Sequence, residues 1–417
     1  MQEAENRAAP SPSHDAAAGR MFAVAWGFLI ATGVFGVLLR LQVVAPMPGV
    51  SYGNILHAHS HTAFLGWVFN AFFALAYLVF VDERERKPFI WLFVWLQAAT
   101  VGMLVAYPLQ GYGAASLSFT TMHMAGAVFF AVRLWRRSPA APATRIYLRA
   151  ALIFMLVSGA GPIALGPLAV MDLRDAPAYD LAIYWYLHFQ YNGWFIFFLV
   201  ALLAHYLRHQ AGAARALRRA FPYLAAGVAL TFALSVLWVT NAPWVYALCI
   251  AGAAAQLAGC AIGGRGVWAV RREWGIPGTI PAALLTTAAA AFILKCTMQL
   301  AAALPALYNL AVHHYTVIGF LHWIFLVVVS PALVGIGATR GWLAAGRRLH
   351  AGLLLWLVGV ASSQFALFYP PIATNLALPH LPNLMQFLLI AAALMLLGII
   401  AIAPVGSAAP HAVSDSA

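Results

Sequence analysis

The chain has 417 residues, of which 64% are hydrophobic and only 8% are charged. This composition is typical of an integral membrane protein and excludes a soluble globular domain. A formal net charge of +12 could indicate a nucleic-acid partner, but the arginines are spread over short loops between apolar runs. We therefore expect the lipid bilayer, and no nucleic acid, as the main partner of this chain.

Twelve apolar runs in the sequence are long enough to cross the roughly 30 Å hydrocarbon core of a bilayer. In chain order they are 21–41, 57–80, 88–107, 116–135, 146–170, 179–207, 220–240, 243–264, 277–304, 306–336, 349–369 and 381–404. The sequence thus predicts an all-α fold, a transmembrane domain of twelve helices over residues 21–405. We expect residues 1–20 to form a disordered cytoplasmic leader and residues 406–417 a cytoplasmic tail.

The basic residues fall at every second connection between these runs. The alternate connections carry only Arg40 and Arg174 as fixed positive charges. Short basic loops stay in the cytoplasm, so this alternation predicts that both termini are cytoplasmic. The chain is then a multi-pass protein of a bacterial inner membrane. The basic connections are 82–87, 136–145, 208–219, 265–272 and 340–348.

Three histidines stand at alternate positions where the second apolar run begins, at His57, His59 and His61. A helix turns by about 100° per residue, so His57 and His61 share one face and His59 points to the opposite side. Imidazole is a common ligand of transition metals and is rare in hydrocarbon without a function. The triplet therefore indicates ligation of a cofactor, from a helix that can serve two metal centres.

Five further histidines lie within even-numbered spans, in the outer half of the membrane or near its middle. They are His123, His188, His313, His314 and His322. The alternative for each of them is a structural, hydrogen-bonded histidine. The segments around His188 and His322 place the ring among aromatic and small residues, which suits a flat macrocycle between helices. The remaining histidines are in tails, loops or span ends, where we expect solvated side chains.

Lys295 is the second unusual feature, because it lies inside the ninth span, one turn from Gln299. A buried ammonium generally faces a partner or a cavity, although a long side chain can also reach the membrane surface. Apart from Asp180 at the start of the sixth span, no acidic side chain lies within a predicted span. A long carboxylate path for protons is therefore not expected, and Lys295 needs another kind of partner.

With these segments, the chain resembles subunit I of the haem–copper oxidases and the large subunit of the nitric oxide reductases. Those proteins have twelve membrane helices in three arcs of four, with histidine ligands in the outer half. The run His57-Ala58-His59-Ser60-His61, followed by Phe64-Leu65-Gly66-Trp67, looks like their His-x-His helix, but it lies on the second span instead of the tenth. Leu-His-Ala-His-Ser-His and His-Phe-Gln-Tyr-Asn-Gly-Trp are also similar to motifs of bacterial membrane proteins distantly allied to that superfamily. The chain also resembles the haem- and copper-containing membrane proteins of the nitric oxide response, which have a similar number of membrane spans.

The resemblance implies a haem protein of oxidase-like arrangement. One or two b-type haems would be held in the outer half by His57, His59 or His61, together with His188, His322 and, as a further candidate, His123. Lys295, Arg40 and Arg174 would bind propionates or other anionic groups. A copper ion could use His313 and His314, since imidazole suits copper.

An open iron position would permit O₂ or NO to bind. If the protein is an enzyme, the resemblance implies an oxidoreductase of the terminal oxidase or nitric oxide reductase type, within a respiratory electron-transport chain. Electrons would come from a quinol, a cytochrome or a second subunit, because the sequence has no Cys-x-x-Cys-His motif. Two alternatives stay open: a non-enzymatic haem or copper protein for sensing or electron transfer, and a transporter whose path is lined by histidines.

Overall fold

The computed structural model describes residues 11–137, 139, 141–273, 275–276 and 278–404. Over these residues the fold is all-helical, without a strand. The segments in chain order are α1 (Pro12–Val44), α2 (Tyr52–His61), η2 (Thr62–Val68), α3 (Phe69–Phe80), η3 (Glu83–Glu85), α4 (Arg86–Gln110), α5 (Ala114–Arg136), α6 (Pro142–Ser158), α7 (Ala160–Val170), α8 (Pro177–His188), η4 (Phe189–Phe195), α9 (Ile196–Tyr206), α10 (Ala211–Thr231), η5 (Phe232–Ser235), α11 (Pro243–Ala269), η6 (Arg271–Glu273), α12 (Thr279–Ala302), η7 (Pro305–Leu307), α13 (Tyr308–Ala311), α14 (His314–His322), η8 (Trp323–Val329), α15 (Ser330–Thr339), α16 (Gly346–Asn375) and α17 (Leu384–Ile402).

Eleven helices in the described part of the chain are long and apolar enough to cross a membrane. They confirm a multi-pass helical membrane protein, but not the predicted count of twelve. The segment that falls short is the predicted seventh span, 220–240, which corresponds to α10. Arg215, Arg218 and Arg219 lie inside this helix, and its α-helical part ends at Thr231. Its uninterrupted apolar stretch is therefore shorter than that of the other spans.

The N-terminal helix begins within residues 1–20, which we expected to form a disordered leader. Residues 1–10 and 405–417 lie outside the described residues, but helix α1 already begins at Pro12, which suits the first turn because proline lacks an N–H. The start of this helix is also held by side chains. A His14 ring nitrogen is 2.9 Å from the Tyr77 carbonyl oxygen, and Trp342 donates to Asp15 at 3.1 Å.

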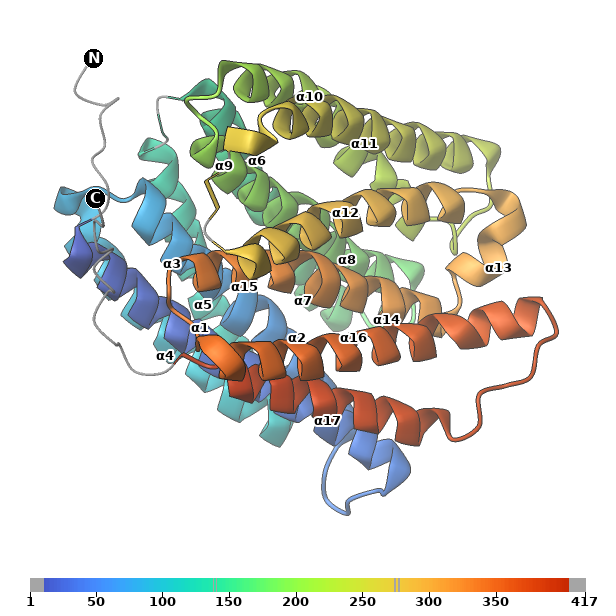
Figure 1. Cartoon of the computed structure of the whole chain (residues 1–417). Helices are drawn as coiled ribbons and strands as arrows, with labels where there is room; N and C mark the ends of the chain where they lie inside the picture. Colours follow the sequence, from blue (N-terminus) through green and yellow to red (C-terminus); the bar gives the residue numbers. More distant parts are fainter. Residues whose placement is uncertain (1–10, 138, 140, 274, 277, 405–417) are drawn as a thin grey trace. The chain divides into compact units, whose positions relative to one another are not determined.

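Contacts divide the chain into two compact units, which we describe separately. The triplet unit comprises residues 11–127, 276–286 and 330–404 and holds the three histidines of α2. Its helix α1 packs against α2, α3 and α17, and α16 lies beside α17 along its length (Figure 1). A side chain at Gly359 or Gly398 would collide with the facing helix, so these glycines permit the close approach.

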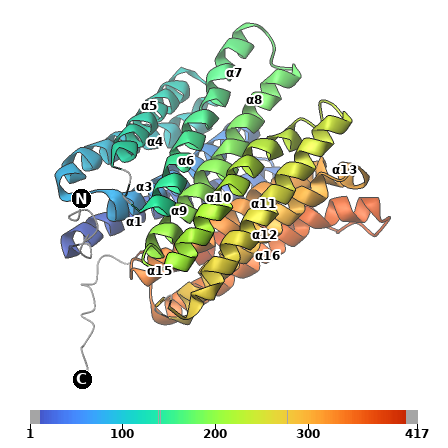
Figure 2. The same ribbon diagram turned by 90° about the horizontal axis from the view of Figure 1, so that it is seen from above.

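The lysine unit comprises residues 128–275 and 287–329 and holds Lys295. Helices α10 and α11 lie side by side in both views (Figure 1, Figure 2), and α6 packs against α9. The fifth predicted span is interrupted between α6 and α7 at Gly159, where the sequence places a Gly-rich break before Pro162. Gly161 then lets α7 contact the backbone of α8.

Three spans contain a seven-residue π-helical segment, and each segment begins directly after a histidine. In the described residues these junctions follow His61, His188 and His322. A π-helix is rare, and where it occurs it is frequently associated with a functional site. The three histidines therefore occupy equivalent positions on the second, sixth and tenth predicted spans.

The first two of these junctions also share a sequence pattern. Gly66 and Trp67 lie five and six residues after His61, and Gly193 and Trp194 lie at the same offsets from His188. Both tryptophans are fully buried. Each glycine faces a phenylalanine of the preceding predicted span, Phe28 for the first and Phe154 for the second. The two units thus contain the same helix-pair arrangement once each.

Candidate functional site

The structure divides the predicted site residues between the two units. The triplet unit holds Arg40, His57, His59, His61 and His123; the lysine unit holds Arg174, His188, Lys295, His313, His314 and His322. Each group is described within its own unit.

His61 has a defined hydrogen-bond state. Its Nδ1 lies 3.0 Å from the backbone oxygen of His57, which can only accept, so Nδ1 carries the proton and donates. The unprotonated Nε2 then accepts from the hydroxyl of Tyr107 at 3.0 Å. The two rings are also stacked, with centroids 4.2 Å apart. Metal-ligating histidines commonly donate from one ring nitrogen to a backbone carbonyl, which orients the ring so that the other nitrogen can bind the metal.

Tyr107 connects this histidine to the start of α5. Its hydroxyl lies 2.8 Å from the hydroxyl of Thr120, whose single proton can go either to Tyr107 or to the carbonyl of Ser116. Tyr112 packs at a tilted angle against the other histidine of this face, with its ring centroid 4.3 Å from that of His57. The ring nitrogens of His57 have no hydrogen-bond partner within the described residues. An aromatic enclosure from α4 and the following loop thus surrounds both histidines.

His59 points away from this pair, as the helical spacing predicts. Its Nδ1 lies 3.0 Å from the backbone oxygen of Thr32 on α1, and so donates to it. One turn further along α1, a side chain at Gly36 would press on the ring at 3.3 Å. The half-buried Arg40 follows after another four residues. Arg40 therefore lies on the α1 face that contacts His59.

His123 contains an unpaired buried nitrogen. The residue is 1% exposed, and its Nε2 has no hydrogen-bond partner. It lies one turn beyond Thr120 on α5, the residue next to the Tyr107–His61 pair, and packs edge-on against Phe69 at 4.9 Å. Buried polar atoms are almost always hydrogen-bonded, so an exception calls for an absent partner such as a water or a bound group.

In the lysine unit, both nitrogens of His188 are used by the protein. Its Nε2 lies 2.8 Å from the backbone oxygen of Val228 and therefore donates. Its Nδ1 accepts from the side-chain amide of Asn192 at 3.1 Å. The residue is buried, and so is the Asn192 carbonyl oxygen, which has no partner. His188 is positioned as a structural histidine, the alternative that the sequence left open.

Lys295 takes part in a buried network of amides. Its Nζ donates to the carbonyl oxygen of Gln256 at 3.0 Å and lies 5.6 Å from the ring centroid of Phe292. The Gln256 amide nitrogen lies 3.2 Å from the carbonyl oxygen of Gln299 and 3.1 Å from the Thr231 hydroxyl. Lys295, Gln256 and Gln299 are each at most 3% exposed. The predicted functional lysine thus has a neutral side-chain partner, which the sequence did not identify.

The other predicted ligands of the lysine unit are less enclosed. His313 caps α14, where its ring accepts from the backbone N–H of Tyr315, and His314 is exposed. His322 donates from Nδ1 to the Ile318 carbonyl at 2.8 Å, as His61 does within its own helix. Arg174 is exposed in the loop between α7 and α8.

No cluster of three or more histidine, cysteine or acidic side chains lies close enough to hold a metal ion in the described residues. This does not favour copper or zinc bound by three side chains. A haem needs only one or two axial imidazoles, which the triplet unit can provide. Sequence reasoning missed Tyr107 and Gln256, since a tyrosine near a span end and a glutamine inside a span are common and only the fold shows which partners they meet.

No protein-family model matches this chain, and no curated protein matches it significantly.

Proposed function

We propose that this chain is a haem-binding integral membrane protein, similar in arrangement to the catalytic subunit of haem–copper oxidases and nitric oxide reductases, which binds or acts on O₂ or NO. The haem site belongs to the triplet unit, with axial imidazoles from His123 and from the α2 histidines. The observation that carries this proposal is the buried Nε2 of His123, which has no partner and lies one turn from Thr120, next to the Tyr107–His61 pair.

The side chains of the triplet unit would fit an iron-bound macrocycle in two ways. The unpaired Nε2 of His123 is available to iron, and the Nε2 of His61 would become available when the Tyr107 hydroxyl that it accepts from is displaced. The rings of Tyr107 and Tyr112, which contact His61 and His57, would enclose the apolar side of such a site. Arg40 lies on the α1 face that contacts His59, on the other side of α2, where it would suit an anionic group separate from this haem.

Haem would be held by the imidazole of His123, and its iron would bind a diatomic gas as long as no α2 histidine occupies it. The residues of this chain would orient the imidazoles, exclude water from their surroundings and provide one hydroxyl. The Tyr107 O–H, which lies beside His61 and Thr120, is a side chain that can give or take a proton. This hydroxyl chain leads toward the α4–α5 connection, without any carboxylate.

The proposal also extends to topology, partners and the remaining ligands. We propose that α10 is the twelfth span, supported on one side by α11, so that both termini are cytoplasmic in a bacterial inner membrane. Electrons would come from a quinol, a cytochrome or a second subunit. Copper at His313 and His314 and cofactor binding by Lys295 and Arg174 stay predictions.

The absorption spectrum of the purified full chain, expressed with a haem supply, tests the proposal. We expect a Soret band and a pyridine haemochrome of b-type, with haem content reduced at least about tenfold in His123→Ala, because an axial bond to iron is lost. His380→Ala is the control, since this residue is exposed in a loop. His188→Ala is expected to retain haem, because both of its nitrogens already have protein partners.

A wild-type protein without a Soret band would overturn the haem proposal, and uptake assays would then test the histidine-lined transporter. A spectrum that stays six-coordinate and low-spin without a CO or NO adduct would replace gas chemistry with sensing or electron transfer. Retention of full haem content by His123→Ala would contradict the assignment of the ligand.

A further inference from the structure

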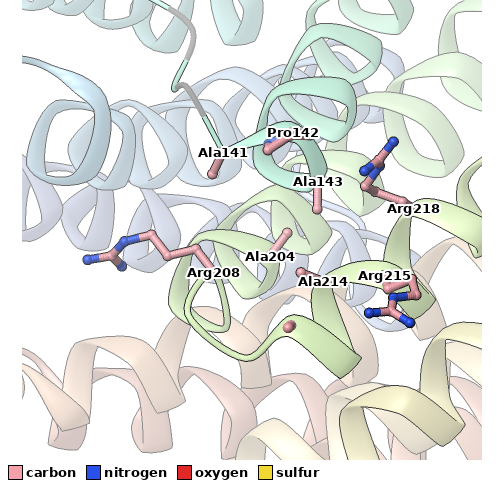
Figure 3. Close-up of a pocket in the computed structure, with 9 residues that line it drawn as sticks. Ala141, Pro142, Ala143, Ala204, Arg208, Ala214, Arg215 and Arg218 are labelled. Carbon is pink, nitrogen blue, oxygen red and sulfur yellow. The ribbon is translucent and has the colours of Figure 1, made fainter. Parts of the chain in front are cut away.

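A pocket of about 190 Å³ lies in the lysine unit where α6 begins, α9 ends and α10 begins. Its lining contains three arginines, Arg208, Arg215 and Arg218, and otherwise alanines and one proline (Figure 3). No acidic side chain belongs to this lining. Figure 3 shows the arginines around the rim, with alanine side chains between them. The pocket therefore combines a small apolar floor with a positive edge.

The arginines of α10 have no partner in the described part of the chain. Arg215 and Arg218 are exposed and make neither a hydrogen bond nor an ion pair there. Arg208 is half-buried and donates to the backbone oxygen of His205 at 2.9 Å, which anchors it at the end of α9. Arginine keeps its charge at all physiological pH values and binds phosphate with two parallel N–H donors. Their guanidinium groups are available to an anion.

Two helix N-termini add positive potential at the same place. Residues at the starts of α6 and α10 line the pocket, and neither helix has a side-chain cap. The free N–H groups and the dipole at such ends favour anions, and phosphate above all. These ends are also the ends of apolar helices, so the pocket lies at the level where lipid headgroups meet water.

We propose that this pocket binds a phosphate group, either the headgroup of an anionic phospholipid or free phosphate. The charged oxygens would contact Arg215 and Arg218, and the alanine floor would face the uncharged part of a lipid headgroup. The neighbouring exposed arginines Arg145 and Arg219, on the same two helices α6 and α10, do not line the pocket. They provide a matched control with the same change in charge.

Native mass spectrometry of the full chain in detergent tests this site. The probes are phosphatidylglycerol, phosphatidylcholine and inorganic phosphate, each titrated separately. We expect one tightly bound phosphatidylglycerol and at least about tenfold weaker binding of phosphatidylcholine. The double variant Arg215→Gln/Arg218→Gln should weaken phosphatidylglycerol binding by at least about tenfold. The double variant Arg145→Gln/Arg219→Gln should bind as the wild type does.

The arms of the experiment separate the two sources of phosphate. If inorganic phosphate displaces the lipid at equal concentration, free phosphate is the ligand; if it does not, the lipid is. Both outcomes support the site. Unchanged binding in Arg215→Gln/Arg218→Gln would overturn it, as would an equal loss in both double variants, which would indicate a general basic surface. Equal binding of phosphatidylcholine would overturn it as well.

Discussion

The regions around His61 and His188 use one local design with two different outcomes. In each, a histidine ends an α-helical segment, a π-helical segment follows, and glycine and tryptophan stand five and six residues later. In the triplet unit the histidine donates from Nδ1 within its own helix and accepts a tyrosine hydroxyl at Nε2. In the lysine unit it donates from Nε2 to the carbonyl of Val228 and accepts an amide at Nδ1.

The difference shows that local sequence does not decide which nitrogen of such a histidine carries the proton or which partner it meets. The Tyr107 hydroxyl can rotate away from His61 or donate its proton elsewhere. The carbonyl of Val228, in contrast, is part of a helix backbone and can do neither. His61 is therefore suited to exchange its partner for a metal, whereas His188 is suited to hold α8 against α10. Because the partners differ, the proton is on Nδ1 in His61 and on Nε2 in His188.

The largest effect that separates the two regions is expected from the alanine variants of these histidines. His188→Ala leaves the Asn192 amide buried without its partner and leaves the Val228 carbonyl only the longer bond from Thr231, so we expect a loss of about 3 kcal/mol in stability. His61→Ala should lose about 1 kcal/mol, because Tyr107 keeps Thr120 and the His57 carbonyl keeps the hydroxyl of Ser60. Thermal unfolding in detergent measures both. Equal losses would contradict the division into a structural and an exchangeable histidine.

The second test uses the glycines that the two regions share. A Cβ at Gly66 would meet Phe28, and one at Gly193 would meet Phe154, so each Gly→Ala variant should lose about 1–3 kcal/mol through overpacking. Gly27→Ala in α1 is the control, since nothing outside its own helix backbone lies within 4 Å of its Cβ position, and it should gain up to about 1 kcal/mol from better helix propensity. Melting temperatures compare the three. If Gly66→Ala or Gly193→Ala behaved like the control, the shared packing would not matter for stability.

The sequence was sufficient for the helical membrane fold and for the orientation of the triplet. Hydropathy and length place eleven of the spans, because each backbone group in a bilayer must be satisfied within its own helix. Helical spacing puts His57 and His61 on one face and directs His59 to the opposite side, and the structure has both. These results depend on periodicity alone, whereas the tyrosines that meet the first face and the α1 contact of His59 came from the fold.

Partners from distant segments could not be predicted. His188 is paired with Val228, 40 residues away, and Lys295 with Gln256, 39 residues away. Which side chain meets which depends on how the helices are packed, and one sequence does not specify it. The count of spans was uncertain for another reason. The arginines of α10 lie inside the helix, so the helix is long enough for a span but its apolar part is not. The π-helical segments had no signal that could be recognised beforehand.

The smallest expected effect concerns the hydroxyl that distinguishes His61 from His188. Tyr107→Phe keeps the stacked ring but removes the donor to Nε2, so the loss should be about 1 kcal/mol. Tyr147→Phe is the control, because its hydroxyl donates to the Leu217 carbonyl in the lysine unit and is buried in the same way. The ¹⁵N shift of His61 Nε2 should move toward that of a free, unprotonated nitrogen in Tyr107→Phe alone. An unchanged shift would mean that the tyrosine does not donate to this histidine, and His61 would then lack the exchangeable partner that sets it apart from His188.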